Sequence, residues 1–333
     1  MMRPRLPEAE PKPFFQVPIP GEEPVQGGVV THDQFRELTG QIELAITVQS
    51  EYLFVGSGQY EFDPSAGSGC PDVWYTFYRR NGQICIPGTS IKGAIRAIVE
   101  SISNSCVSQR RGQERSQIDS APQPCKYKKD EKSLLCPACR LFGTTGFRGR
   151  VYFSDSEPDG NIQMKIVKIG ELWEPKRHEN ARRFYEAKIF QPITNQQPEK
   201  NFRFVEAVPK ESKFRVSLQF ENLSKAELGL VCHALGWDVK KDKRESAFTP
   251  KLGGAKPRCF GAVKFKPIQL RLWQENILAS GLKPLILQEE EMSRFLVECL
   301  QECQRSNLLH SKSWNMLMQK LKAQNEPCPR GIY

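Results

Sequence analysis

The spacing of apolar residues along the chain follows two periods, and each period predicts a different kind of element. Strict alternation of apolar and polar side chains, as in KFRVSLQF at 213–220, is typical of a strand with one buried face. Short runs rich in aromatic and β-branched residues, such as WYTFY at 74–78, also favour strands. On these grounds we predict strands near residues 41–47, 74–78, 150–154, 162–167, 213–220 and 260–272, with an Asp159-Gly160 turn between the third and the fourth.

A helical period replaces this alternation after Pro87. Apolar residues recur three and four positions apart over residues 91–102, and Thr89 or Ser90 is placed to cap the first turn. The same period favours a helix at 225–235. The chain therefore mixes strands with at least two helices in its central part.

The C-terminal part carries two more helical stripes of apolar residues, at 289–305 and 314–321. Three glutamates begin the first stripe, where the positive end of the helix dipole favours them. Cys299 and Cys303 lie on the apolar side and are interpreted as core residues. The two helices either pack on their own domain or bind a partner.

The order of these elements favours an α+β fold, an elaborated ferredoxin-like or RNA-recognition-like sandwich. The division we predict is an extended Pro-rich arm at 1–37, a core at 38–271 and a helical extension at 272–333. Two segments within the core lack clear periodicity and are read as additions, an insertion at about 104–146 and an excursion at about 170–209.

Length and composition indicate a folded protein of the cytoplasm. The chain has 333 residues, of which 39% are hydrophobic and 26% charged, close to globular averages. It contains no apolar run long enough to span a membrane, and its N-terminus lacks the apolar region of a signal peptide, so we expect no membrane association. In the cytoplasm its 11 cysteines are expected to be thiols or metal ligands and not disulfides.

The positive charge is concentrated in two segments. The formal net charge is +10, and residues 106–150 hold 10 basic against 4 acidic groups, while residues 237–271 hold 10 against 3. Such segments favour a polyanionic partner, although solvated loops explain them equally well.

Four cysteines have the spacing of a metal site. They follow the pattern C-x18-C-x10-C-x2-C and are Cys106, Cys125, Cys136 and Cys139. Zinc prefers four tetrahedral thiolates in structural sites, and a C-x2-C turn presents two sulfurs to one ion. We predict structural zinc here; in the alternative, Cys106 belongs to the end of the preceding helix and only the Cys136–Cys139 pair matters.

Two further segments are candidate phosphate-binding sites. In one, cations lie beside the free amides of a helix start, and in the other they lie beside flexible glycines. Lys92 and Arg96 lie four residues apart near the start of the first helix, where the amides and the dipole favour an anion. The segment 253–261 joins glycines to cations, which allows close approach to a phosphate. Its candidate residues are Gly253, Gly254, Lys256 and Arg258, although a tight loop before a strand accounts for the glycines equally well.

Three motifs together resemble the RAMP superfamily, and specifically the backbone subunits of type III CRISPR effector complexes. They are IPGTSIKGAIR at 86–96, CPACRLFG at 136–143 followed by RVYFSD at 150–155, and the glycine-rich loop before Val263. The motifs stand in family order and cover roughly residues 38–270.

This resemblance implies a subunit that stacks along CRISPR RNA and grips its backbone, with other RAMP subunits and a large subunit as partners. Ser90, Lys92 and Arg96 of the first motif would then contact RNA. In this family a hairpin called the thumb interrupts the duplex of guide and target RNA. The excursion at 170–209 is the segment we assign to it, with Arg182 and Arg183 near the tip beside Phe184 and Tyr185; in the alternative, these residues pack under a neighbouring subunit.

Some members of the family cleave target RNA with one Asp and a divalent metal. Asp72 matches that position in the loop between two predicted strands, so the resemblance implies cleavage that depends on Mg²⁺ or Mn²⁺. The alternative is an inactive structural or filament-capping subunit. A third possibility, a CRISPR-RNA-processing endonuclease that uses His32 and His178, is less consistent with the cysteine cluster.

Overall fold

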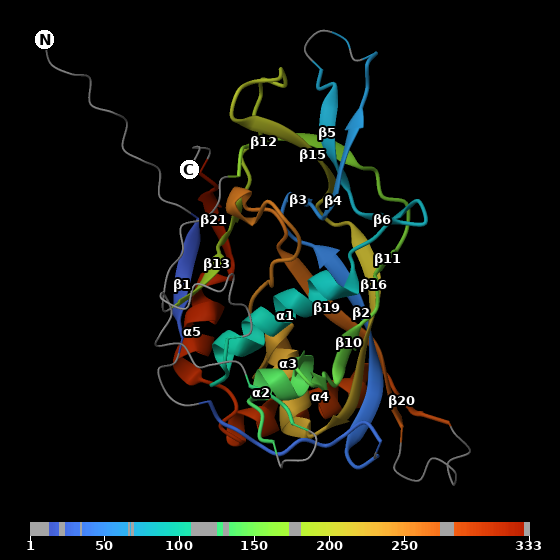
Figure 1. Cartoon of the computed structure of the whole chain (residues 1–333), viewed down its shortest axis with the longest axis vertical. Coiled ribbons are helices and arrows are strands. Elements are labelled where there is room, and N and C mark those ends of the chain that lie inside the picture. Colours follow the sequence, from blue (N-terminus) through green and yellow to red (C-terminus); the bar gives the residue numbers. More distant parts are fainter. Residues whose placement is uncertain are drawn as a thin grey trace, which may run out of the picture.

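A computed structural model gives the fold of the chain and describes residues 13–19, 24–33, 35–65, 67, 70–107, 125–128, 133–172, 181–273 and 283–329. The fold is mixed α+β, with several sheets and helices (Figure 1). Parts of the predicted arm, insertion, excursion and extension, and His178, lie outside the described residues. The helices are α1 (Gly88–Ile102), α2 (Pro137–Phe142), α3 (Lys225–Ala234), α4 (Glu289–Arg305) and α5 (Ser311–Lys320).

The main sheet is antiparallel and has one buried and one solvated face. Its order is β10 (Val151–Phe153), β16 (Lys213–Leu223), β2 (Leu38–Val48), β19 (Val263–Trp273) and β20 (Leu285–Leu287), and β11 (Glu157–Pro158) also pairs with β16. Along β2, Ile42, Leu44, Ile46 and Val48 are completely buried, while the residues between them are partly exposed. This is the alternation that the sequence predicted for a half-buried strand.

A β–α–β–β–α–β order underlies this sheet. The chain runs through β2, α1, β10, β16, α3 and β19, and the helices cover one face of the sheet (Figure 1). The predicted helices at 91–102 and 225–235 and the strands at 41–47, 150–154, 213–220 and 260–272 are confirmed.

A second sheet stands at the top of the molecule in Figure 1, above α1 and the main sheet. It has the order β12, β15, β5 and β4, and β3 pairs with β15. The strands are β3 (Tyr52–Leu53), β4 (Gly56–Phe62), β5 (Val73–Phe77), β12 (Lys165–Gly170) and β15 (Phe202–Pro209). The two strands expected on either side of Asp159-Gly160 therefore belong to different sheets, and the predicted hairpin between them is wrong.

The described part of the excursion that we assigned to the thumb begins and ends in the second sheet, where β12 and β15 pair antiparallel, and contacts both terminal segments. Its last strand, β15, joins the second sheet, while β13 (Ala181–Tyr185) pairs with β1 (Phe14–Pro18) of the arm. Next to it, β14 (Ala187–Ile189) pairs with β21 (Ala323–Pro327) near the C-terminus. Val17 of β1 is completely buried, so this strand ties the excursion to the core.

Small two-stranded ribbons complete the fold. They are β6 (Arg79–Arg80) with β7 (Gln83–Ile84), β8 (Gly143–Thr144) with β9 (Phe147–Arg148), and β17 (Trp237–Lys240) with β18 (Lys243–Ser246). A single 3₁₀ turn, η1, covers Lys256–Arg258.

The two C-terminal helices pack on their own domain. Met292, Leu296, Cys299, Leu300 and Cys303 of α4 are buried in the main core. On α5, the ring of Trp314 lies 4.7 Å from that of the buried His233. The prediction of Cys299 and Cys303 as core residues is confirmed. Among the described residues, no helix has the length and apolar character needed to span a membrane.

One expectation about the cysteines is wrong, because Cys259 and Cys328 form a disulfide. Cys259 ends the 3₁₀ turn in the glycine-rich loop, and Cys328 follows β21. The bond joins positions 69 residues apart in sequence and holds the C-terminal segment against this loop. We had expected reduced thiols because we inferred a cytoplasmic protein. That inference does not tell which cysteines lie close together in the fold.

Candidate metal centre and nucleic-acid interface

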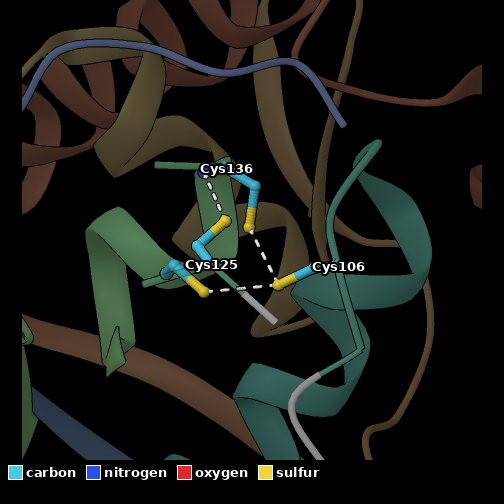
Figure 2. Close-up of side chains that lie close together, drawn as sticks. Cys106, Cys125 and Cys136 are labelled. Atoms are coloured by element: carbon cyan, nitrogen blue, oxygen red, sulfur yellow. Dashed lines mark hydrogen bonds between the residues drawn. The ribbon is translucent and has the colours of Figure 1, made fainter. Parts of the chain in front are cut away.

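The four predicted zinc ligands converge on one point. Their sulfur atoms all lie within 4.8 Å of one another, and Figure 2 shows three of them facing each other. The Sγ of Cys106 is 3.5 Å from that of Cys136 and 3.4 Å from that of Cys139. Cys106, at the C-terminal side of α1, therefore belongs to the cluster and not only to the helix end. These residues form a group that could bind a metal ion.

The donor set fits zinc. Four thiolates about 2.3 Å from a tetrahedral Zn²⁺ are about 3.8 Å from one another, close to the separations found here. Hydrogen bonds among the sulfurs lower the pKa of Cys136 and raise the pKa values of Cys106 and Cys139, so the four thiols are tightly coupled. Arg96 adds a positive charge, with its Nη2 4.0 Å from the Sγ of Cys139. The residues present thus supply both the sulfur ligands and part of the charge balance.

The first turn of α1 is capped from outside the helix, not by Thr89 or Ser90 as predicted. The cap position is Pro87, and the carboxylate of Asp155 accepts the Gly88 N–H at 2.8 Å. Gly88 is required because a Cβ there would lie 2.1 Å from the Phe153 carbonyl oxygen. The IPG and RVYFSD motifs therefore form one junction between α1 and β10, with Ser90 partly exposed beside it.

Two cations expected to bind RNA face the interior. Arg96 donates to Glu100 at 2.8 Å and to the Gly143 carbonyl at 2.9 Å. Arg182 forms an ion pair with the same carboxylate, and the Glu100 side chain is 1% exposed. The structure thus brings Arg96 and Arg182 together around one buried acid, next to the cysteine cluster. Arg183 lies outside this group and stacks over the Phe14 ring at 4.4 Å.

Lys92 is different, because it faces other cations. Its Nζ lies 4.9 Å from the centre of the Tyr152 ring, and the guanidinium of Arg148 lies 4.9 Å from the same ring. Burial, followed by the charges of Arg96 and Arg148, lowers the pKa of Lys92. Among the described residues no acid pairs with Lys92, whereas Arg148 reaches Glu221 at 3.5 Å. This cationic surface, consisting of Lys92, Arg148 and the Tyr152 ring, is suited to a phosphate.

The glycines of the C-terminal loop allow it to pack against the turn before β4. Gly253 has a positive φ of 73°, and a Cβ on it would lie 2.1 Å from the Phe54 carbonyl oxygen. The Gly254 N–H donates to that oxygen at 2.8 Å. The tight-loop explanation therefore accounts for both glycines, whatever further role the loop has.

The cations of the same loop are buried or half-buried. Arg258 is 3% exposed and donates to the carbonyls of Gly170 and Glu171 at 3.1 and 2.9 Å, linking the loop to the end of β12. Burial lowers the pKa of Lys256. In this conformation the loop presents little positive charge to solvent.

A model of the RAMP superfamily matches residues 46–264, about two thirds of the chain. The chain belongs to the RAMP superfamily. Membership of this family indicates a CRISPR-associated subunit that binds CRISPR RNA and assembles with other Cas proteins. A search of curated proteins gave no match. The matched region of this RAMP protein contains α1, the cysteine cluster and the glycine-rich loop, while β1, α4 and α5 lie outside it.

Asp72 occupies an exposed position at the tip of the β4–β5 hairpin of the RAMP protein. Its carbonyl accepts the Asp63 N–H at 2.9 Å, which closes the base of the connecting loop. The residue lines a cavity of about 330 Å³ on the second sheet. Among the described residues, the cysteine cluster is the only group of three or more potential ligands close enough to share a metal ion. A metal at Asp72 would therefore depend on ligands from RNA and water.

Sequence reasoning missed two classes of residue at these sites. Tyr152 lies within the RVYFSD motif and Arg148 just before it, but neither received a binding role, and only their approach to Lys92 suggests one. Asp155 and Glu227 are acids whose partners lie 67 or more residues away in sequence. No fixed sequence spacing identifies such acid–partner pairs, because only the folded chain brings the two residues together.

Lys251 is a buried lysine whose titration predicts a pH dependence of stability. It is 8% exposed, its Nζ has no hydrogen-bond partner among the described residues, and burial lowers its pKa to about 7. The charge of Lys256 adds to the lowering, and Glu186 opposes it. Since unfolding restores an ordinary lysine pKa, the unfolded state binds more protons between about pH 7 and 10.5.

We expect the free energy of unfolding to rise with pH across that window, and Lys251→Met to remove the rise. Below pH 7 the variant should be more stable than the parent by roughly 3 kcal/mol, since the ammonium is no longer buried. Urea unfolding at several pH values measures this, with the exposed Lys264→Met as control. A variant that stays less stable than the parent at pH 6 would contradict the assignment.

Proposed function

We propose that this RAMP protein is a guide-RNA-binding backbone subunit of a type III CRISPR effector complex, in which zinc holds the segment after α1 in place. The cationic surface of Lys92 and Arg148, each 4.9 Å from the centre of the Tyr152 ring, carries the proposal. A phosphate bound at this surface would offset the burial and the charges of Arg96 and Arg148, which together lower the pKa of Lys92. Other RAMP subunits and a large subunit are the expected protein partners, and target RNA pairs with the guide.

The architecture supports this proposal. The β–α–β–β–α–β order with the sheet order β10, β16, β2, β19 is that expected of an elaborated ferredoxin-like core. The cysteine cluster fixes α2 against the end of α1, and Arg96 ties it to the helix. Zinc would supply structural stability there, and the chain's own residues would contact RNA.

Lys92→Ala is expected to weaken binding of a single-stranded guide RNA about 5- to 10-fold near 0.1 M salt. Loss of one phosphate contact should also reduce the slope of log K against log salt by about 0.7. Fluorescence anisotropy at several salt concentrations measures both quantities. Lys312→Ala, at the exposed start of α5, is the matched control and should leave both unchanged. Equal salt slopes for the parent and Lys92→Ala would exclude the phosphate contact.

A second candidate activity is metal-dependent cleavage of the target RNA at Asp72. It is favoured by one observation, an exposed carboxylate beside a cavity large enough to hold part of an RNA strand. Mg²⁺ is often bound by one or two carboxylates together with phosphate oxygens, so a single protein ligand is compatible with this chemistry. The carboxylate would hold the ion against the RNA backbone.

Asp72→Asn is expected to reduce target cleavage at one set of positions by about 100-fold or more, because metal ligation contributes several kcal/mol to the transition state. Binding of guide and target should persist. The assay uses the reconstituted complex with Mg²⁺ or Mn²⁺, and Asp63→Asn in the same loop is the control. If Asp72→Asn cuts at every position as fast as the parent, the subunit is structural, as in the filament-capping alternative.

A further inference from the structure

The second sheet contains a cavity whose aromatic lining is not accounted for by the phosphate contacts or by the cleavage chemistry at Asp72. It measures about 330 Å³ and lies between the β4–β5 hairpin, β15 and the loop that precedes β15. Aromatic and acidic residues make up most of its lining. The aromatic residues are Tyr60, Trp74, Tyr75, Phe202 and Phe204.

One wall is a ladder of flat groups across three strands. Tyr60 and Tyr75 are cross-strand partners whose ring centres are 3.9 Å apart, with the ring planes tilted by 42°, and their hydroxyls are hydrogen-bonded. The guanidinium of Arg203 lies 4.7 Å from the centre of the Tyr75 ring and pairs with Glu171. The outer member, Tyr60, is 49% exposed. The ladder therefore ends in a ring that is open to a further flat group.

The opposite wall is fixed in place by a buried lysine. Lys168 has a side chain that is 0% exposed, and it donates to the carbonyls of Asn195 and Gln197 at 2.9 and 2.5 Å. It also pairs with Glu199 at 2.9 Å and lies 5.0 Å from the centre of the Phe202 ring. The loop at 195–199 is thus tied to the sheet before any ligand arrives, which lowers the entropic cost of binding.

The rim contributes hydrogen-bond acceptors more than donors. Asp72, Glu171 and Glu199 line the cavity, and Arg203 is the only cation among its lining residues that the structure describes. That guanidinium is already engaged by Glu171 and by the Tyr75 ring. Glu171 and Glu199 are likewise engaged, by Arg203 and Lys168, so Asp72 is the lining carboxylate that no cation of the described residues pairs with. The aromatic rings favour a flat ligand, and this carboxylate favours N–H groups and disfavours a phosphate inside.

We propose that this cavity binds one unstacked nucleobase, and that it prefers guanine. Stacking on Tyr60 and the neighbouring rings holds the base, as aromatic side chains hold single-stranded nucleic acids in general. Guanine presents two adjacent N–H donors on one edge, which match a carboxylate, whereas uracil presents one N–H between two carbonyls that a carboxylate repels. The proposal rests on the RNA-binding function. It adds a base-binding site on the second sheet to the phosphate-binding surface at the start of α1.

Nucleosides test the cavity separately from the phosphate surface, because they carry no charge. Guanosine, adenosine, cytidine and uridine are titrated into the full chain and followed by saturation-transfer NMR. Guanosine is expected to bind most tightly and uridine least tightly. Tyr60→Leu should weaken guanosine binding about 5-fold or more, since stacking on an aromatic ring contributes at least that much.

Phe62→Leu is the matched control. Phe62 lies on the same strand, is 69% exposed and is outside the lining of this cavity, so guanosine binding should not change. Equal binding of guanosine by the parent and Tyr60→Leu, or no preference among the four nucleosides, would overturn the proposal. If the chain binds guide RNA but none of the nucleosides, the cavity assignment fails and the RNA-binding function stands. If it binds guanosine but no guide RNA, the cavity assignment stands and the RNA-binding function fails.

Discussion

Cys139→Ser is expected to remove the bound metal and to destabilise the fold by several kcal/mol. Structural zinc sites contribute binding free energy directly to folding, on the order of 10 kcal/mol in small domains. Cys139 is 1% exposed, and its sulfur completes the cluster with Cys106, Cys125 and Cys136. Loss of one thiolate leaves three sulfurs and a nearby guanidinium without the ion that organises them.

Elemental analysis and thermal unfolding measure this result. The parent should contain about one zinc ion per chain, and a chelator should lower its melting temperature. Cys70→Ser, at an exposed free cysteine, is the matched control and should keep both the metal and the stability. If Cys139→Ser does not fold, release of zinc from the parent by a thiol-modifying reagent gives the same information. A parent that is folded, free of metal and insensitive to chelator would exclude the site.

The secondary structure and the cysteine cluster were accessible from sequence because each depends on a local rule. Alternation along β2 and β16 and the helical period of α1 and α4 reflect which side of an element faces the core. The C-x2-C turn at Cys136 brings two ligands together within one short helix. Such signals need no knowledge of distant partners.

The roles of individual charges could not be predicted in the same way. Arg96 and Arg182 were both expected to bind RNA, yet they meet at Glu100, and nothing in the sequence around Arg182 indicates that acid. The disulfide between Cys259 and Cys328 was also not predictable from local sequence, because the fold brings the C-terminal segment to the glycine-rich loop. A cation stays available to RNA unless the fold buries it with an internal partner, and that is a property of tertiary structure.

Glu227→Gln extends this reasoning to the residues that hold the zinc-binding segment against the core. The Oε1 atom of Glu227 accepts from the Arg140 Nε at 2.9 Å and from the Arg150 Nη2 at 2.7 Å. All three side chains are at most 10% exposed. The same glutamate closes a capping box with Ser224 at the start of α3. One carboxylate therefore joins α2, the start of β10 and α3.

We expect Glu227→Gln to lower the free energy of unfolding by about 3–5 kcal/mol, because it leaves two buried guanidinium groups without their counter-ion. Glu298→Gln is the matched control. It removes the ion pair of Glu298 with Lys225 of α3, whose side chains are 52% and 47% exposed, so less than about 1 kcal/mol should be lost. Urea unfolding of both variants measures the difference. Equal losses would mean that Arg140 and Arg150 find water or backbone carbonyls in place of the carboxylate. A large loss for Glu227→Gln alone would instead assign both arginines to the fold and leave Lys92 and Arg148 as the cations available for phosphate.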